Sequence, residues 1–423
     1  MIDTSVEYAQ QLDSRDPLAA LRDRFAIPRP RQSDELTYLV GHSLGLQPKA
    51  ARDLVIEELD KWADLGVAGH FRTDRPWAPY HESIAEPMAK LVGALPREIV
   101  AMNGLTVNLH LLMASFYRPT AERHEILIED HAFPSDHYVA ESQLRLHGYD
   151  PGKALITVAP RPGTDNLDRE DILETIAARG ERLALVLLPG IQYYTGQVLP
   201  MAEIVAAGHR VGANVGLDLA HAAGNIEMSL HDWGPDFAAW CTYKYLNSGP
   251  GSTAIAYVHE RHLSNPDIPR LEGWWGHDKA SRFDMDNRFV DPNTAEAWQM
   301  SNSAILSTAP VIASLGEFER AGGMGPLRAK AERIGTYLDS MLDELVGDRV
   351  ERITPGSPAE RGSQVSLRMR GGIDGQSVFD QLLAADIQCD WRFPDVIRVA
   401  PTSLYNTFSD VHRFTTLLSS ILS

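Results

Sequence analysis

The chain has 423 residues, 44% of them hydrophobic, and a formal net charge of -18 at pH 7. A chain of this length is too long to fold around one hydrophobic core of ordinary size, so we expect a globular protein with two lobes. The acidic balance argues against nucleic acid or an anionic membrane surface as a partner, because both need a basic face.

Two further features indicate a cytoplasmic protein. Residues 1–5 lack the charged region and apolar core of a signal peptide, and no apolar run approaches the length of a membrane span. Cys241 and Cys389 are the only cysteines, too few for a disulfide framework or a zinc cluster. The dispersed histidines show no metal-ligand spacing, so we expect no metal.

In chain order, the first strong pattern is helical. Apolar residues over 50–66 recur at helical spacing until Gly66. From about 100 onward, short apolar runs such as 125–128 and 183–188 alternate with helical patterns, as in βα units. The sequence therefore predicts an α/β lobe.

The last hundred residues are organised differently. A helical stretch at 303–319 is followed by a glycine-rich turn at 322–325 and a charged amphipathic helix through Leu345. We expect a large domain over 66–325 and a small α+β domain over 326–423. Residues 1–65 should join the small domain.

Asp218 and Lys244 carry the clearest chemical signal. Each follows a short apolar run, at 215–217 and 237–240, that suits a buried parallel strand. Ligands of open α/β sheets bind beyond the carboxyl ends of such strands. A lysine that forms a Schiff base and an aspartate that pairs with a pyridinium nitrogen are the requirements of pyridoxal 5'-phosphate (PLP). Taken singly, Asp218 could cap a helix and Lys244 could be a solvated loop residue.

Thr106 and Arg398 are further candidates with alternatives left open. Thr106 follows the turn signal Asn103-Gly104 and precedes a helical pattern over 107–116, so it could bind a phosphate, act as an N-cap, or both. Arg398 interrupts the apolar strand pattern at 396–400 and needs a carboxylate partner when buried. That partner could be an internal Asp or Glu, or a substrate carboxylate.

The residues around Lys244 resemble one family. The segment 240–252, Trp-Cys-Thr-Tyr-Lys-Tyr-Leu-Asn-Ser-Gly-Pro-Gly-Ser, is similar to the PLP-lysine segment of kynureninases. Seven other segments look like motifs of that family and stand in family order: 38–46, 105–110, 133–136, 193–197, 273–277, 300–302 and 397–401. The resemblance thus covers nearly the whole chain.

The resemblance implies a fold and a cofactor site. The fold would be PLP-dependent fold type I, with a mostly parallel seven-stranded sheet flanked by helices in the large domain. PLP would form a Schiff base with Lys244, with Asp218 and His221 beneath its ring and Phe133 stacked on it. Phosphate contacts would come from Leu105, Thr106 and Tyr243, and the remaining cofactor positions would be Ser135, Asp136, Trp274 and Asn302.

The resemblance also implies a reaction. A homodimer with its active site at the interface would hydrolyse the Cβ–Cγ bond of L-kynurenine, 3-hydroxykynurenine or a ring-modified kynurenine to an anthranilate and L-alanine. Lys244, Tyr194 and Asp218 would be catalytic, with Tyr194 transferring protons. The amino-acid substrate would contact Ser43, His70, Trp275, Asn302 and Arg398, and Trp274 would come from across the interface.

Departures from the family pattern fall near the expected substrate. His42 stands where asparagine is usual, Ser303-Ala304 replaces a Pro-Pro pair, and Ser403 replaces a proline before Leu404. They bear on substrate identity more than on reaction class. Two alternatives stay open: another fold type I enzyme, such as an aminotransferase or a cysteine desulfurase, and a binding protein without turnover.

Overall fold

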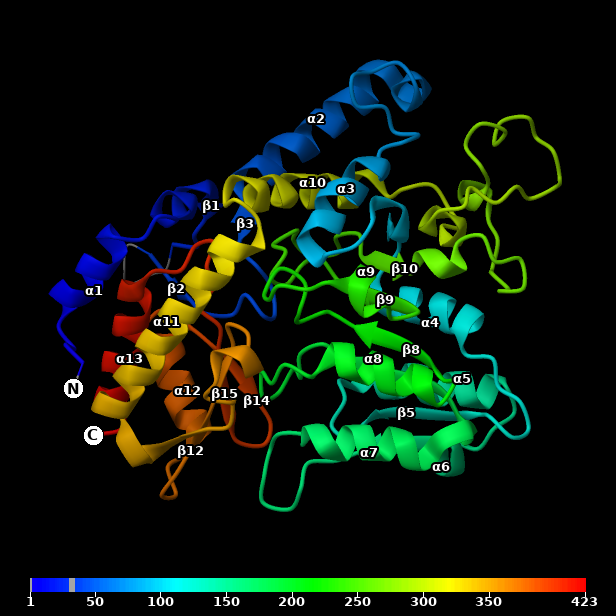
Figure 1. Cartoon of the computed structure of the whole chain (residues 1–423). Coiled ribbons are helices and arrows are strands. Elements are labelled where there is room, and N and C mark those ends of the chain that lie inside the picture. Colours follow the sequence, from blue (N-terminus) through cyan, green and yellow to red (C-terminus); the bar gives the residue numbers. More distant parts are fainter. Residues whose placement is uncertain (1, 30–34) are drawn as a thin grey trace.

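A seven-stranded sheet forms the centre of the larger part of the molecule in the computed structural model, which describes residues 2–29 and 35–423 (Figure 1). Its strand order is β4-β10-β9-β8-β7-β5-β6, and only β10 runs antiparallel to its neighbours. The strands are β4 (Ile99–Ala101), β5 (Glu125–Glu129), β6 (Leu155–Val158), β7 (Leu183–Pro189), β8 (Asn214–Asp218), β9 (Phe237–Trp240) and β10 (Ile255–Val258). The mostly parallel sheet predicted from the sequence is confirmed.

Helices cover both faces of this sheet because side chains alternate along each strand. Ile126 and Ile128 point to the face covered by α4 (Leu105–Phe116) and α5 (Pro134–Leu146). Leu127 points to the opposite face, against α7 (Arg169–Arg179) and α8 (Met201–Arg210). The other helices of this part are α3 (Glu82–Val92), α6 (Pro151–Ala154), α9 (Leu230–Trp233) and α10 (Ile305–Arg320). This arrangement buries five strands on both faces, which explains their near-continuous apolar sequences.

A smaller antiparallel sheet lies beside the large one and has the order β11-β12-β15-β14 (Figure 1). It consists of β11 (Val350–Arg352), β12 (Val365–Met369), β15 (Val396–Val399) and β14 (Asp390–Arg392). Its helices are α11 (Met324–Leu345), α12 (Gly375–Ala384) and α13 (Phe408–Ile421). Residues of α11, α13 and the sheet share one hydrophobic core.

The N-terminal segment contributes to that smaller part. Helix α1 (Val6–Ser14) packs against α13, and β2 (Thr37–Tyr38) pairs in parallel with β13 (Ile387–Gln388). Helix α2 (Lys49–Leu65), by contrast, packs along α10, and the short strands β1 (Phe25–Ala26) and β3 (Gln47–Pro48) pair beside it. The domain boundaries expected near 65 and 325 stay a prediction. In the parts of the chain that the structure describes, no helix has the length and apolar character to cross a bilayer.

Candidate active site

Asp218 and Lys244 come together because β8 and β9 are parallel neighbours. Asp218 is the last residue of β8 and lies opposite Ala239 of β9, and the chain beyond β9 turns back so that Lys244 faces the same edge. Glu129 ends β5 at this edge too. The carboxyl ends of adjacent parallel strands thus form the site, as expected for an open α/β sheet.

These strand ends surround a cavity of about 270 Å³. Most of the cofactor positions expected from the sequence line it, namely Leu105, Thr106, Phe133, Ser135, Asp136, Asp218, His221, Tyr243 and Lys244. Gly104, Val107, Glu129, Pro189, Ile191, Tyr193 and Ala220 complete the lining. The structure therefore brings one half of the predicted site residues into a single cavity.

The turn that carries Lys244 is fixed by the N-terminal loop. The Gly45 N–H donates to the Tyr243 carbonyl at 2.8 Å. A Cβ on Gly45 would lie 2.4 Å from the Lys244 carbonyl oxygen, so this close approach requires glycine. The Lys244 Nζ atom lies 5.7 Å from the centroid of the Phe133 ring, which is 43% exposed toward the cavity side. An aromatic face and an amine therefore border the same space.

Three carboxyl groups share this cavity with one lysine. Burial raises the pKa of Asp136 well above its usual range, and a hydrogen bond with Asp218 adds to that rise. Burial also raises the pKa of Asp218, which the Ala220 N–H and the Lys244 ammonium counteract. Burial and the negative charge of Asp218 raise the pKa of Glu129 to about 8. The arrangement keeps a proton among these carboxyls near neutral pH, ready to pair with a buried ring nitrogen.

His221 lies next to Asp218 with an unsatisfied ring nitrogen. Its side chain is buried, and its Nδ1 has no hydrogen-bond partner within residues 2–29 and 35–423. Burial, followed by the charges of Lys244 and Arg398, holds the pKa of His221 well below its usual range. A neutral buried imidazole that faces a cavity with an open nitrogen is expected to contact a ligand there.

Helix α4 supplies the anion-binding end of the cavity. It begins at Leu105, its N-cap Gly104 has no side chain to cap it, and no acidic residue occupies its first turn. The first intrahelical bond joins the Asn108 N–H to the Gly104 carbonyl, so the N–H groups of residues 105–107 are left for another acceptor. Such a terminus suits a phosphate. With Lys244, the carboxyls and His221, the residues present fit PLP.

Glu129 and Tyr193 line the cavity although the sequence did not single them out, whereas Tyr194, expected at the site, does not line it. Glu129 could have been found from its place at the end of an apolar strand. Tyr193 lines the cavity and packs edge-on against Phe133, with centroids 5.3 Å apart. The Tyr194 hydroxyl donates to Asp395 at 3.1 Å, and burial raises the pKa of Tyr194 to about 12. Neighbouring tyrosines in a turn face different ways, which sequence alone did not reveal.

Arg398 lies on β15 of the small sheet and is only 1% exposed. It forms an ion pair with Asp390, and its Nη1 donates to the Tyr193 carbonyl at 2.5 Å. Arg398 does not line the cavity, but this hydrogen bond joins it to Tyr193, which does. An internal carboxylate partner, one of the two alternatives left open by the sequence, is therefore present.

The expected substrate residues His70, Trp274 and Trp275 do not line the cavity but meet one another. Ring contacts lead from His70 to Phe71 at 6.0 Å and from Phe71 to Phe283 at 5.5 Å. They continue from Phe283 to Trp274 and from Trp274 to Trp275, both at 5.5 Å. Of this set of five rings, hereafter the aromatic cluster, Phe71 is 59%, Trp274 52% and Phe283 49% exposed, whereas Trp275 is buried.

The remaining substrate positions and departures lie in different surroundings. Ser43 and Asn302 are exposed and do not line the cavity. Ser303 is buried beside Asn302. Ser403 is buried, and its hydroxyl donates to the Leu327 carbonyl at 2.8 Å in α11. The change at Ser403 therefore serves packing of the small domain, whereas His42 lies within hydrogen-bond reach of Asp390.

Both cysteines are unsuited to nucleophilic chemistry. Cys241 and Cys389 are each 2% exposed. Burial raises the pKa of Cys241 and raises that of Cys389 to about 12. Because the thiolate is the reactive form, neither residue can provide the accessible cysteine that a desulfurase would need.

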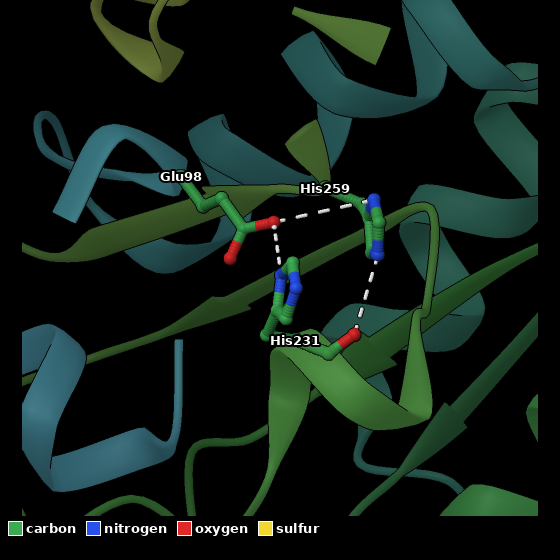
Figure 2. A group of neighbouring side chains, drawn as sticks. All are labelled: Glu98, His231 and His259. Atoms are coloured by element: carbon green, nitrogen blue, oxygen red, sulfur yellow. Dashed lines mark hydrogen bonds and ion pairs between the residues drawn. The ribbon is translucent and has the colours of Figure 1, made fainter. Parts of the chain in front are cut away.

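A second titratable cluster, Glu98, His231 and His259, lies outside the cavity (Figure 2). Glu98 accepts from His231 at 3.0 Å and from the Glu260 N–H at 2.8 Å, and His259 accepts from the Arg261 N–H at 3.1 Å. The two imidazole rings are nearly parallel, at 12°. Their lone pairs do not converge on one point, so we interpret the cluster as packing rather than as a metal centre.

Comparison with known proteins adds the family. Residues 327–418 match the family model for the kynureninase C-terminal domain, and residues 38–277 match that for aminotransferase class-V. Proteins named kynureninase from Xanthomonas oryzae pv. oryzae (strain PXO99A) and Koribacter versatilis (strain Ellin345) are 53% and 50% identical. The alignment with the Xanthomonas protein covers 96% of this chain and 96% of that protein. The alignment with the Koribacter protein covers 97% of this chain and 96% of that protein.

Solved structures share the fold at low sequence identity. A cystine C-S lyase, C-DES, in complex with cysteine persulfide has a TM-score of 0.77 and 18% identity, covering 91% of this chain and 97% of that one. A cysteine desulfurase from Thermococcus onnurineus NA1 has a TM-score of 0.75 and 18% identity, covering 96% and 98%. The chain belongs to the kynureninase family and has the fold type I architecture of PLP-dependent enzymes.

Proposed function

We propose that this protein hydrolyses the Cβ–Cγ bond of L-kynurenine, or of a ring-substituted kynurenine, to an anthranilate and L-alanine. One observation carries the proposal: Lys244, Asp218, His221 and the start of α4 border one cavity in a chain of the kynureninase family. Among the alternatives, the desulfurase is disfavoured by the buried state of both cysteines. A cytoplasmic location stays a prediction from composition.

The cofactor half of the site would hold PLP, which supplies an electron sink when bound. Lys244 would bind its aldehyde carbon covalently through Nζ, and the N–H groups at the start of α4 would bind its phosphate. Asp218 would accept a hydrogen bond from the ring nitrogen, with Asp136 holding a shared proton beside it. Phe133 would cover the ring on the side facing Tyr193. Ser135 and Tyr243 line the same space and would complete the polar contacts.

The chain's own groups would then move protons for the substrate. Lys244 Nζ would take the α-proton of the substrate. Tyr243 lines the cavity, as does Tyr193. The proton-transfer role of Tyr194 stays a prediction from resemblance, because its hydroxyl is engaged by Asp395. Cleavage at Cγ also consumes one water molecule.

The substrate half would require a second copy of the chain. Phe71, Phe283 and Trp274 of the aromatic cluster are exposed in one chain, together with Trp62 at 63% and Val67 at 81% at the end of α2 and just beyond it. Large exposed apolar patches mark interaction sites. A homodimer would cover this surface and would carry His70, Trp275, Asn302 and Trp274 toward the partner's cavity. Ser43 lies on the loop beside His42 and would approach the substrate carboxylate with Arg398.

Product analysis tests this function directly. Purified protein with PLP is incubated separately with L-kynurenine and 3-hydroxykynurenine, and the aromatic amine and alanine are quantified together. Equal amounts of alanine and an anthranilate are expected. A keto acid in place of alanine would indicate an aminotransferase. A change in cofactor absorbance without cleavage would mean that the pocket binds amino acids but the leaving group is wrong.

The ring preference is tested by the same assay. We propose that the change at Ser303 adapts the site to a modified ring, because Ser303 lies beside Asn302 in a segment expected near the substrate. The ratio of kcat/KM values among plain and ring-substituted kynurenines should then differ from one. Equal turnover of all analogues would contradict this adaptation.

A further inference from the structure

Asp390 is placed beside Arg398 by the register of the small sheet. Strands β14 and β15 are antiparallel, and Asp390 lies directly opposite Arg398 in the ladder. Opposed residues project from the same face of a sheet. Their side chains form an ion pair, and the same Asp390 oxygen, Oδ2, lies 3.2 Å from His42 Nε2 and 3.1 Å from Arg392 Nη2. One carboxylate oxygen thus organises three nitrogen-bearing side chains.

His42 enters this arrangement from the N-terminal loop. Val40 bridges to Ala400, and the Ala400 N–H donates to the Leu39 carbonyl at 2.7 Å, which attaches the loop to the end of β15. His42 is completely buried, and burial lowers its pKa to about 3, so its imidazole is neutral. A carboxylate only accepts hydrogen bonds, so the single ring proton lies on Nε2. His42 is therefore a hydrogen-bond donor to Asp390.

Arg398 keeps one donor unused. Its Nη2 faces Asp390 and its Nη1 donates to the Tyr193 carbonyl, whereas its Nε has no partner among the described residues. A buried donor without a partner costs about 1–3 kcal/mol, so such a group usually has a function. Arg398 Cζ lies 6.0 Å from the ring centroid of Tyr193, which lines the cavity. The guanidinium therefore keeps a buried, unpaired Nε–H beside a residue that lines the cavity.

We propose that Asp390 and His42 are positioning residues that orient Arg398, leaving its Nε–H edge for the α-carboxylate of the substrate. The inference rests on the proposed function, which supplies an amino-acid substrate. An arginine recognises a carboxylate through a planar fork, so its orientation decides the strength of binding. Asp390 binds Nη2 of the guanidinium and the Tyr193 carbonyl binds Nη1, so together they fix its plane. His42 holds Asp390 in place by a hydrogen bond. Selection for a carboxylate would therefore depend on His42, one of the positions where this chain differs from the pattern expected for the family.

The test compares two ligands that differ only at the carboxylate. Binding of L-alanine and of L-alaninamide to the PLP-loaded protein is measured by the change in cofactor absorbance, and the ratio of the two Kd values gives the carboxylate selection. Asp390→Asn should weaken L-alanine binding about 10- to 100-fold and leave L-alaninamide binding nearly unchanged. With L-kynurenine, KM should rise by a similar factor while kcat changes less than about threefold.

His42 variants and a matched control complete the design. His42→Asn keeps a side-chain N–H donor and should preserve the selection, whereas His42→Leu should lower it. Asp339→Asn removes the carboxylate that pairs with the buried Arg361 in the same part of the fold, away from the cavity, and should leave the selection unchanged. If Asp390→Asn fails to fold, the two His42 variants still test the proposal.

Three results would overturn the inference. Equal weakening of both ligands would show a general structural role, and tighter L-alanine binding in Asp390→Asn would show that Asp390 competes with the substrate. Absence of carboxylate selection in the unaltered protein would also contradict it. The proposed function fails separately, if the unaltered protein binds L-alanine selectively but cleaves no kynurenine.

Discussion

The cofactor side and the substrate side of the site differ in how they are assembled. The cofactor side lies within one chain, on strand ends and one helix start between residues 104 and 244. The substrate side is divided among Arg398 of the small sheet and the aromatic cluster. Adjacent parallel strands therefore bring the proposed cofactor residues together by local geometry. The positions of the proposed substrate residues depend instead on contacts between distant parts of the chain and between two copies of it.

The largest effect should come from the cofactor side. Lys244→Ala removes the amine that we propose binds PLP and takes the α-proton, so kcat/KM should fall about 10,000-fold or more. The absorbance of the lysine-bound cofactor should also disappear. Lys90→Ala, at an exposed lysine paired with Glu86, serves as control and should retain activity. A Lys244→Ala protein that kept its activity would contradict the assignment.

The next effect should come from the aromatic cluster. Phe71→Glu places a charge in a surface that the proposed dimer covers, so the dimer should dissociate and activity should fall about 100-fold at low protein concentration. Sedimentation velocity measures the dissociation. Leu146→Glu changes a residue that is 77% exposed on α5, away from the cluster, and should remain dimeric. A dimeric, active Phe71→Glu protein would show that the interface lies elsewhere.

Tyr243 and Tyr194, the two tyrosines that could transfer protons, should respond differently to loss of the hydroxyl. Tyr243 lines the cavity, whereas Tyr194 donates to Asp395 beyond it. Tyr243→Phe should lower kcat about 10- to 100-fold. Tyr194→Phe should lower the free energy of unfolding by about 1 kcal/mol and change kcat only slightly. A larger loss of kcat in Tyr194→Phe would restore the role that the family resemblance gives it.

A separate prediction concerns the stability of the cofactor side without PLP. Glu129 has a pKa of about 8 when folded, above its usual value of 4.5. Between these values the folded state binds more protons than the unfolded state, so the unfolding free energy falls as pH rises. Glu129→Gln removes this dependence, so it should gain stability relative to the unaltered protein from pH 5 to pH 8, by about 2–4 kcal/mol. The unfolding free energies of both proteins are measured by urea unfolding as a function of pH. Parallel curves for the variant and the unaltered protein would show that Glu129 does not titrate this way.

Much of the cofactor side could be predicted from the sequence. The apolar runs at 125–128, 183–188 and 237–240 became β5, β7 and β9 within one residue, because a doubly buried strand leaves a continuous apolar signal. Asp218 and Lys244 follow such runs, so the strand-end rule located them. The same rule applied to β5 would have found Glu129.

The substrate side was less predictable for physical reasons. His70 and Trp274 meet through Phe71 and Phe283, contacts across some 200 residues that no local pattern encodes. The partner of Arg398 is close to it in sequence, since β14 and β15 form a hairpin. Period-two alternation places Asp390 on the same face of the small sheet as Arg398. His42 reached this pair only through the bridge between Val40 and Ala400.

The most direct test of this division is complementation between two inactive chains. Lys244→Ala and His70→Ala chains with different tags are co-expressed, and the mixed dimer is isolated and assayed. If His70 serves the partner's cavity, one of its two sites is complete, and about half of the activity of the unaltered dimer should return. A mixed dimer as inactive as either parent would contradict the account, because His70 would then act within its own chain.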